Sequence, residues 1–196
     1  LAPYGEPVHL DELRRLISRA GPLFELNLDY FVHQVEGVDM TWEDETPAIG
    51  TLYSPKLVKL LGPVREKGAP LEKLHEDVAA SLQKVLEEAY LHVIRTLHER
   101  TGSRALCLAG GVALNAVANG LVRHETPCEE LYIQPAAGDS GTAVGAAFHV
   151  WNQTLGNPRG FVMRHADTGP EYGPEEIEAA LVRAGLSARL LDDEEL

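Results

Sequence analysis

Two short apolar segments, each leading through a glycine turn into helical periodicity, constrain the fold of this chain more than any other feature. The predicted elements are a strand at 105–109, a turn at Gly110 and Gly111, a helix at 112–122, a strand at 131–133, a turn at 134–141 and a helix from Thr142 to about Gln153. Two strand–helix units in series predict parallel strands within a layered α/β fold. In such folds ligands bind beyond the carboxyl ends of the strands.

A long amphipathic helix is predicted ahead of these units, over 71–98. Its apolar residues advance by threes and fours and are Leu71, Leu74, Val78, Leu82, Val85, Leu86, Ala89, Val93 and Leu97. The charged residues predicted for the other side are Glu72, Lys73, Glu76, Asp77, Lys84, Glu87 and Glu88. Pro70 stands where the helix can start and Gly102 where it should end. We expect this helix to lie with its apolar side on the sheet.

The other predicted elements are shorter. Leucines spaced at helical intervals predict a helix over 9–20, and alternation of apolar and polar residues predicts a strand over 23–30. In order, the elements are a helix over 9–20 ending at Gly21, a half-buried strand over 23–30, a loop over 36–53, a helix that Ser54 caps and that ends at Gly62, a linker over 159–173 and a helix over about 174–184. Helices and strands alternate along the chain, so the fold class is α/β.

Charge and composition exclude several classes of protein. The chain has 17 Lys and Arg residues against 30 Asp and Glu residues, a formal net charge of −13. Such a surface repels phosphate backbones and anionic lipids, so we expect no nucleic-acid partner and no membrane partner. No apolar run reaches the roughly 18 residues of a membrane span and no signal peptide is visible, so we expect a cytoplasmic protein. The two cysteines are too few for a disulfide framework.

The first glycine turn is a candidate nucleotide site. Gly110 and Gly111 would let the backbone approach a phosphate or a ribose closely. Asn115, which we place one turn into the following helix, could bond a sugar hydroxyl or a phosphate oxygen. The alternative is that the two glycines only permit tight packing of strand against helix, with Asn115 facing solvent.

The second glycine turn contains the residues Gly138, Asp139, Ser140 and Gly141 ahead of the next helix. Asp139 is either an N-cap residue or a metal ligand beside a phosphate. Spacing alone favours the N-cap, because one carboxylate does not make a metal site and no histidine lies near it in a suitable pattern.

Other titratable residues show weaker patterns. His75, His92 and His98 are predicted near the polar side of the long helix, and they form no metal-binding pair four residues apart. His165 and Asp167 could form a ligand pair but are more typical of a solvated loop. Cys107 is predicted inside a buried strand. The sequence contains no Walker A motif and no serine nucleophile elbow.

The segments around both turns resemble those of a known enzyme family. The segment 108–115, together with 117–120, is similar to the hallmark of carbamoyltransferases of the NodU/CmcH type. The segment 133–141, followed by 145–147, resembles their second signature. Further blocks in the family's order are 1–5, 61–63 with Arg65, 77–83 and 169–172. One departure is Ala116, where relatives often carry cysteine.

The resemblance implies an actin-like fold of the sugar-kinase and heat-shock ATPase type, in which two lobes enclose a nucleotide. Residues 1–168 would form the second lobe, with a central sheet flanked by helices. Residues 169–196 would begin the C-terminal YrdC-like region. An N-terminal lobe, which carries two metal-binding histidines in the family, would precede residue 1. These other parts of the same polypeptide are expected partners.

The resemblance also implies an activity. Such enzymes use ATP and carbamoyl phosphate to make carbamoyl adenylate and transfer the carbamoyl group to a hydroxyl of a small molecule. By position, Gly110, Gly111 and Asn115 would contact the nucleotide, together with the second turn. Asp139 would complete the site of a divalent metal such as Fe²⁺, which favours the ligand role over the N-cap.

Two other functions are compatible with similar turns. One is transfer of a threonylcarbamoyl group to tRNA by an enzyme of the same fold. The charge of −13 and the segments 1–5 and 169–172 argue against it. The other is a nucleotide-dependent binding switch without catalysis. Dependence on carbamoyl phosphate would separate the enzyme from the switch.

Overall fold

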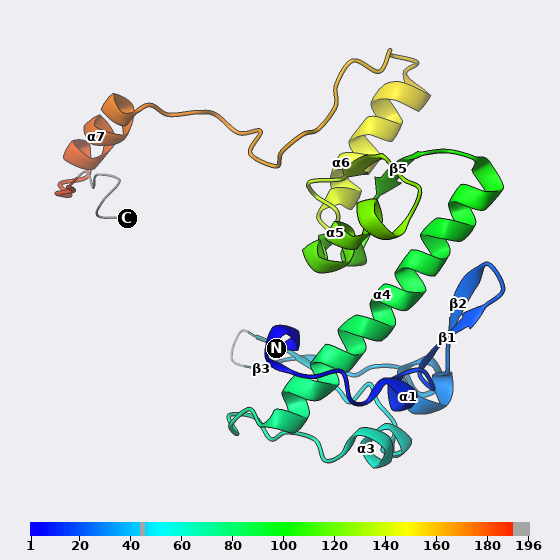
Figure 1. Cartoon of the computed structure of the whole chain (residues 1–196). Helices are drawn as coiled ribbons and strands as arrows, with labels where there is room; N and C mark the ends of the chain where they lie inside the picture. The colour runs from blue at the N-terminus through cyan, green and yellow to red at the C-terminus, as the bar shows by residue number, and fades with distance from the viewer. Residues whose placement is uncertain (44–45, 190–196) are drawn as a thin grey trace. The chain divides into compact units, whose positions relative to one another are not determined.

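The computed structural model describes residues 1–43 and 46–189. These residues have the predicted α/β character, and among them are one long helix, shorter helices and three two-stranded sheets (Figure 1). It divides into two compact units, Leu1–Thr142 and Ala143–Leu196. Within the described ranges no sheet exceeds two strands, so the broader central sheet that we expected is not formed here. None of the described helices is long and apolar enough to cross a membrane.

Helix α4, Lys73–Thr101, is the long helix predicted from the sequence (Figure 1). At its start, the backbone N–H of Glu72 donates to Nδ1 of His75 at 2.9 Å, which satisfies a backbone group ahead of the first turn. At its end, Gly102 adopts the left-handed conformation with φ +68° and donates its N–H to the carbonyl of His98. The predicted end is therefore confirmed.

The buried face of α4 differs from the predicted one. Val85, Leu91 and Ile94 are buried, but so are Asp77, Ser81 and Glu87, two of which were predicted on the polar side. Leu82 and Leu97 are 44% and 46% exposed. Helical spacing identified the helix but not its orientation, because Asp77, Ser81 and Glu87 have hydrogen-bond partners that make their burial tolerable.

Strands β5, Ala105–Leu108, and β6, Glu130–Ile133, form the predicted parallel pair, with Leu106 opposite Leu131. A 3₁₀ helix (η3, Gly111–Leu114) and then helix α5 (Ala116–Glu125) join them, so the helix predicted from residue 112 begins later. The core beside this pair consists of Leu91, Ile94, Leu106, Val122 and Cys128. Cys107 is exposed, contrary to prediction, because successive side chains of a strand alternate between its faces and the neighbouring Leu106 takes the buried face.

The predicted helix over 9–20 is wrong beyond its first turn. Helix α1 covers Leu10–Leu13, and strand β1, Ile17–Ala20, pairs antiparallel with β2, Leu23–Leu26. The two-residue connection is Gly21–Pro22, and Gly21 has φ +57°. The leucine spacing fits a helix, but the Gly-Pro pair favours a hairpin.

Two further predictions in this region are corrected. The strand predicted over 23–30 ends at Leu26 with exposed residues, and the 3₁₀ helix η2, Leu28–Tyr30, follows it. The predicted loop over 36–53 contains the antiparallel strands β3, Met40–Glu43, and β4, Thr46–Ile49, after the short helix α2, His33–Glu36. Residues 44 and 45 of that loop lie outside the described residues.

The helix predicted after Ser54 is α3, Pro55–Leu61, and it ends before Gly62 as expected. The Ser54 hydroxyl does not cap it. It donates instead to the carbonyl of Asp29 at 2.8 Å. A further 3₁₀ helix, η1, covers Ala2–Tyr4 at the start of the chain.

The predicted helix over 142–153 is present as α6, Gly141–Phe148, followed by a π-helical turn, η4, His149–Thr154. The expected linker over 159–173 has no helix or strand, and helix α7, Pro174–Arg183, follows it as predicted. Residues 190–196 of the expected C-terminal region lie outside the described part. The predicted boundary between residues 168 and 169 stays a prediction.

Candidate functional site

The two glycine turns lie side by side at the carboxyl ends of β5 and β6. The backbone N–H of Gly110 donates to the carbonyl of Ala137 at 2.8 Å, which joins one turn to the other. The N–H of Gln134 donates to the carbonyl of Leu108 at 3.0 Å and extends the ladder to the ends of both strands. Parallel pairing thus brings both turns to the edge where open α/β sheets bind ligands.

Two of the four turn glycines are required by the fold itself. Gly110 has φ +97° and ψ 163°, a conformation that costs L-residues free energy. A Cβ on Gly141 would overlap the backbone oxygen of Ala136. These two glycines are explained by the shape of the turns.

The shape of the turn does not require a glycine at position 111. The φ of Gly111 lies outside the left-handed region, and a Cβ built on it would meet no atom within 4 Å in the described structure. A Cβ on Gly138 would make only an ordinary contact, 3.7 Å from Leu114 Cδ1. The fold therefore tolerates a side chain at Gly111, so the missing side chain leaves room for a ligand.

Asn115 is the N-cap residue of α5, not a residue one turn inside a helix as predicted. Its Oδ1 accepts the backbone N–H of Ala118 at 3.0 Å. Its Nδ2 donates to Oε1 of Gln83 at 2.9 Å, and Nε2 of Gln83 donates to Oδ1 of Asn115 at 3.3 Å. An asparagine ahead of a helical run is a recognised cap signal. Gln83 lies in the family block 77–83, but nothing in that block predicted its contact with Asn115.

A second asparagine, Asn119, holds the 3₁₀ helix η3 that follows the first turn. Nδ2 of Asn119, a residue only 7% exposed, donates to the carbonyl of Ala113 at 2.8 Å. The hydroxyl of Tyr90 donates to Oδ1 of Asn119 at 2.7 Å, and burial raises the pKa of that hydroxyl. Asn119 and Tyr90 fix the position of η3. Asn119 belongs to the family segment 117–120, but no supporting role was predicted for it or for Tyr90.

The second turn presents Asp139 at the surface. Its backbone carbonyl accepts the N–H of Thr142 at 3.0 Å and the Thr142 hydroxyl at 2.6 Å, so the cap of α6 uses the main chain of Asp139. Its carboxylate has no hydrogen bond or ion pair in the described residues. Ser140 beside it is also exposed.

A metal ion would need more ligands than this turn supplies. Among residues 1–43 and 46–189, no three His, Cys, Asp or Glu side chains are grouped so that they could hold one. Asp139 alone offers one carboxylate, whereas divalent cations take four to eight donors. The residues described here therefore do not fit a complete metal centre.

Similarity to known proteins identifies the family. The family described as the carbamoyltransferase N-terminus matches residues 1–148. The chain belongs to this family. The match includes every predicted site residue between Gly110 and Gly141.

Relatives of this carbamoyltransferase-family chain are much longer than the chain itself. An uncharacterized protein of Synechocystis, sll1178, is 41% identical over 190 residues, which cover 92% of this chain and 28% of the relative. The nodulation protein NolO of Bradyrhizobium diazoefficiens is 38% identical over 81% of this chain and 25% of its own length. The nodulation protein NolNO of Sinorhizobium fredii is 37% identical over 62% of this chain and 18% of its own length. The chain thus spans about a quarter of the length of the first two.

Two of the histidines predicted near the polar side of α4 contact backbone carbonyl groups. His92 Nε2 lies 2.8 Å from the carbonyl of Gly21, and His98 Nδ1 lies 2.8 Å from the carbonyl of Ser103. Nδ1 of His165 lies 3.6 Å from Oδ2 of Asp167, and both side chains are exposed. The geometry of this last pair agrees with a solvated loop.

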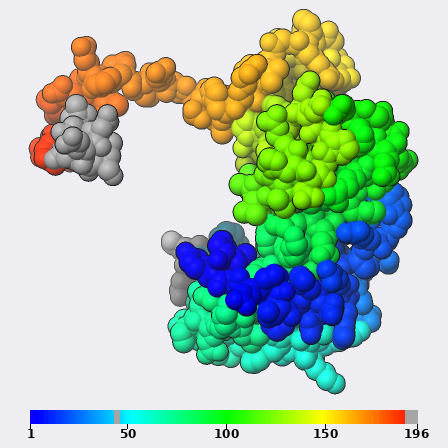
Figure 2. Space-filling view, in the orientation of Figure 1, coloured from blue at the N-terminus to red at the C-terminus, as the bar shows by residue number. Residues whose placement is uncertain are grey.

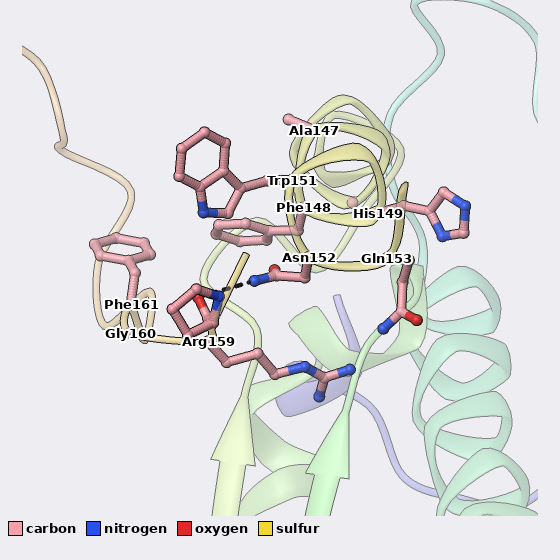
Figure 3. Close-up of a pocket in the computed structure, with 11 residues that line it drawn as sticks. Ala147, Phe148, His149, Trp151, Asn152, Gln153, Arg159, Gly160 and Phe161 are labelled. Carbon is pink, nitrogen blue, oxygen red and sulfur yellow. Dashed lines mark hydrogen bonds between the residues drawn. The ribbon is translucent and has the colours of Figure 1, made fainter. Parts of the chain in front are cut away.

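None of the predicted site residues lines the groove formed by residues 145–161. It has a volume of about 1090 Å³ and is lined mainly by the π-helical turn and by Pro158–Phe161. Figure 3 shows Phe148, Trp151 and Phe161 on its aromatic side and Arg159 extending beneath Gln153. The rings of Phe148 and Phe161 are 5.9 Å apart. Most of this groove lies beyond the residues matched by the family.

Proposed function

We propose that this chain is part of an ATP-dependent carbamoyltransferase and that its two glycine turns contact the phosphates of the nucleotide. The reaction would use ATP, carbamoyl phosphate and water to form carbamoyl adenylate, phosphate and pyrophosphate. The hydroxyl of a small-molecule acceptor would then attack the carbamoyl carbon, and AMP would leave. The observation that carries the proposal is the pairing of both turns through the Gly110–Ala137 hydrogen bond.

The turns offer what a phosphate group needs. The open space at Gly111 lets an oxygen approach the backbone N–H groups of the turn. The second turn leads into α6, whose N-terminus carries partial positive charge that favours an anion. Asn115 adds a side-chain amide at the edge of the first turn.

Asp139 supports a metal at the same place for an electrostatic reason. A carboxylate beside a phosphate is repulsive unless a cation lies between them. The Asp139 carboxylate is exposed and, within the described residues, unpaired. We propose that it contributes one ligand to a divalent cation such as Fe²⁺, with the other ligands supplied by other parts of the polypeptide.

Other parts of the protein are included in the proposal. Since the chain spans about a quarter of the relatives NolO and sll1178, we infer that an N-terminal lobe and a YrdC-like C-terminal region complete the cleft. The lobe described here would then be one half of an actin-like fold. We propose that the protein works in the cytoplasm, where ATP is available. The 196-residue chain alone should be inactive.

The sharpest test of the nucleotide site uses Gly111→Ala in the full-length polypeptide. The added methyl group has free space in the fold, so thermal stability should stay within about 0.5 kcal/mol of the parent. It should clash with bound nucleotide and weaken ATP binding by about 1–3 kcal/mol, as measured by calorimetry.

Gly120→Ala is the matched control for this experiment. Gly120 also has open space around a Cβ, but it lies inside α5 instead of in the turn. Alanine there should stabilise the helix slightly and leave ATP affinity unchanged. Equal ATP affinity of Gly111→Ala and the parent protein would remove the first turn from the nucleotide site.

Threonylcarbamoyl transfer to tRNA is the second candidate, because its enzymes have similar turns. The net charge of −13 disfavours it, since phosphate backbones bind to basic surfaces. Product formation that requires threonine and bicarbonate in place of carbamoyl phosphate would support it. ATP binding without any carbamoylated product would support a binding switch instead.

A further inference from the structure

A buried carboxylate is linked to Asn115 through one intervening side chain. Glu87 of α4 is only 7% exposed, although glutamate is seldom buried without partners. Its Oε1 accepts Nε2 of Gln83 at 3.0 Å, and its Oε2 lies 3.5 Å from Nζ of Lys84. Gln83 is the residue that also pairs with Asn115.

This carboxylate sets the direction of the hydrogen bonds beyond it. Oε1 of Glu87 accepts from Nε2 of Gln83, so the NH₂ group of Gln83 is turned toward Glu87. Oε1 of Gln83 then faces Asn115 and accepts from Nδ2 at 2.9 Å. The N–H of Ala118 imposes the same orientation on Asn115, because it needs an acceptor and finds Oδ1.

As a result, any further hydrogen bond of the Asn115 side chain must be one in which its NH₂ group donates. Within the described residues its Oδ1 already accepts two N–H groups, from Ala118 and from Gln83. Its Nδ2 carries two hydrogens, of which the bond to Gln83 uses one. One N–H remains for a group at the turn, and that group must offer an oxygen or nitrogen acceptor.

We propose that Gln83 and Glu87 are positioning residues that hold Asn115 as a hydrogen-bond donor toward an acceptor oxygen of the nucleotide. The proposal rests on the nucleotide site proposed above. Neither residue needs to touch the ligand. Gln83 acts through Asn115, and Glu87 acts through Gln83.

The test compares ATP affinity in two backgrounds of the full-length polypeptide by calorimetry. Gln83→Met keeps the side-chain length and removes both hydrogen bonds to Asn115, and it should weaken ATP binding roughly tenfold. Asn115→Ser keeps an N-cap oxygen for α5 but removes the donating amide. In the Asn115→Ser background, Gln83→Met should cause no further loss beyond about twofold.

Controls separate this role from general stability. Glu88→Gln changes the neighbouring carboxylate, which pairs with Arg14 at 2.7 Å, and should leave ATP affinity unchanged. If Gln83→Met does not fold, Glu87→Gln is the replacement variant. It should weaken ATP binding about threefold in the parent background and not in the Asn115→Ser background.

Each outcome has a distinct meaning. Loss of affinity in the parent background only supports the positioning role. Equal losses in both backgrounds overturn it, because Gln83 would then act independently of Asn115. Unchanged affinity in the parent background also overturns it while leaving the nucleotide site intact. A parent protein that binds no ATP overturns the proposed function and this inference together.

Discussion

The two halves of α4 are held by different kinds of contact. Toward its N-terminal end, backbone groups of the first residues of the chain bond to side chains of the helix. The N–H of Glu6 donates to Oδ1 of Asp77 at 2.7 Å, and the N–H of His9 donates to Oγ of Ser81 at 3.0 Å. Figure 2 shows this first segment, in dark blue, lying over that part of the molecule.

Toward its C-terminal end, apolar packing supplements hydrogen bonds such as that from the Tyr90 hydroxyl to Oδ1 of Asn119. Leu91 and Ile94 pack with Leu106, Val122 and Cys128 under the parallel strands. Hydrogen bonds are directional and fix one position, whereas apolar packing depends on burial and volume. The Glu87–Gln83–Asn115 contacts lie between the two regions, where the candidate site needs a fixed geometry.

The largest expected loss of stability comes from a substitution in the apolar core at the C-terminal end of α4. Ile94 is 4% exposed, so Ile94→Ala should destabilise the protein by about 2–5 kcal/mol through lost burial and a cavity. The change in the free energy of unfolding is measured by urea unfolding of the full-length polypeptide, with hydrogen exchange in α4 as the probe. Leu97→Ala, at a site 46% exposed, should cost far less. Similar losses for both variants would show that the apolar core is not where the structure places it.

A smaller effect is expected where the first segment crosses α4. A Cβ on Gly5 would overlap the backbone oxygen of Glu76, so Gly5→Ala must lift the segment from the helix. We expect a loss of about 1–3 kcal/mol and faster hydrogen exchange at the Glu6 and His9 amides. Gly169→Ala, which has open space around the new methyl group, is the control. Protected Glu6 and His9 amides in Gly5→Ala would contradict this close approach.

The smallest expected loss of stability, at Asp77, should depend on pH. The N–H of Glu6 and, next, the ammonium of Lys73 lower the pKa of Asp77 below its usual value of about 3.9. The lowered pKa means that ionised Asp77 contributes stability above that usual value and that this contribution disappears as pH falls through the folded-state pKa. Asp77→Asn should therefore be less stable than the parent at pH 7, with a difference that shrinks below about pH 4. A difference independent of pH would show that the charge of Asp77 has no role.

Local signals in the sequence predicted the elements that depend on neighbouring residues. Gly102 marked the end of α4, and the apolar segments before each glycine turn marked β5 and β6. The helix predicted over 9–20 was wrong beyond its first turn, because the leucine spacing suits a helix whereas the Gly21–Pro22 turn closes a hairpin. A local pattern cannot decide between these two when both fit.

Contacts between distant residues could not be predicted. Asp77 and Glu87 looked like surface residues of α4, and their burial depends on Glu6, 71 residues away, and on Gln83. Gln83 and Asn115 are 32 residues apart, with nothing in either segment that signals the other. The glycine turns were predicted as a site, but the residues that support Asn115 became visible only in the fold.

Product analysis with the full-length polypeptide tests whether this site belongs to a carbamoyltransferase. The polypeptide is incubated with ATP and carbamoyl phosphate, and the products are identified by mass spectrometry. Carbamoyl adenylate together with pyrophosphate is the predicted result, and Gly111→Ala should reduce both. Slow release of ADP with no carbamoylated nucleotide would contradict the carbamoyltransferase assignment of this site.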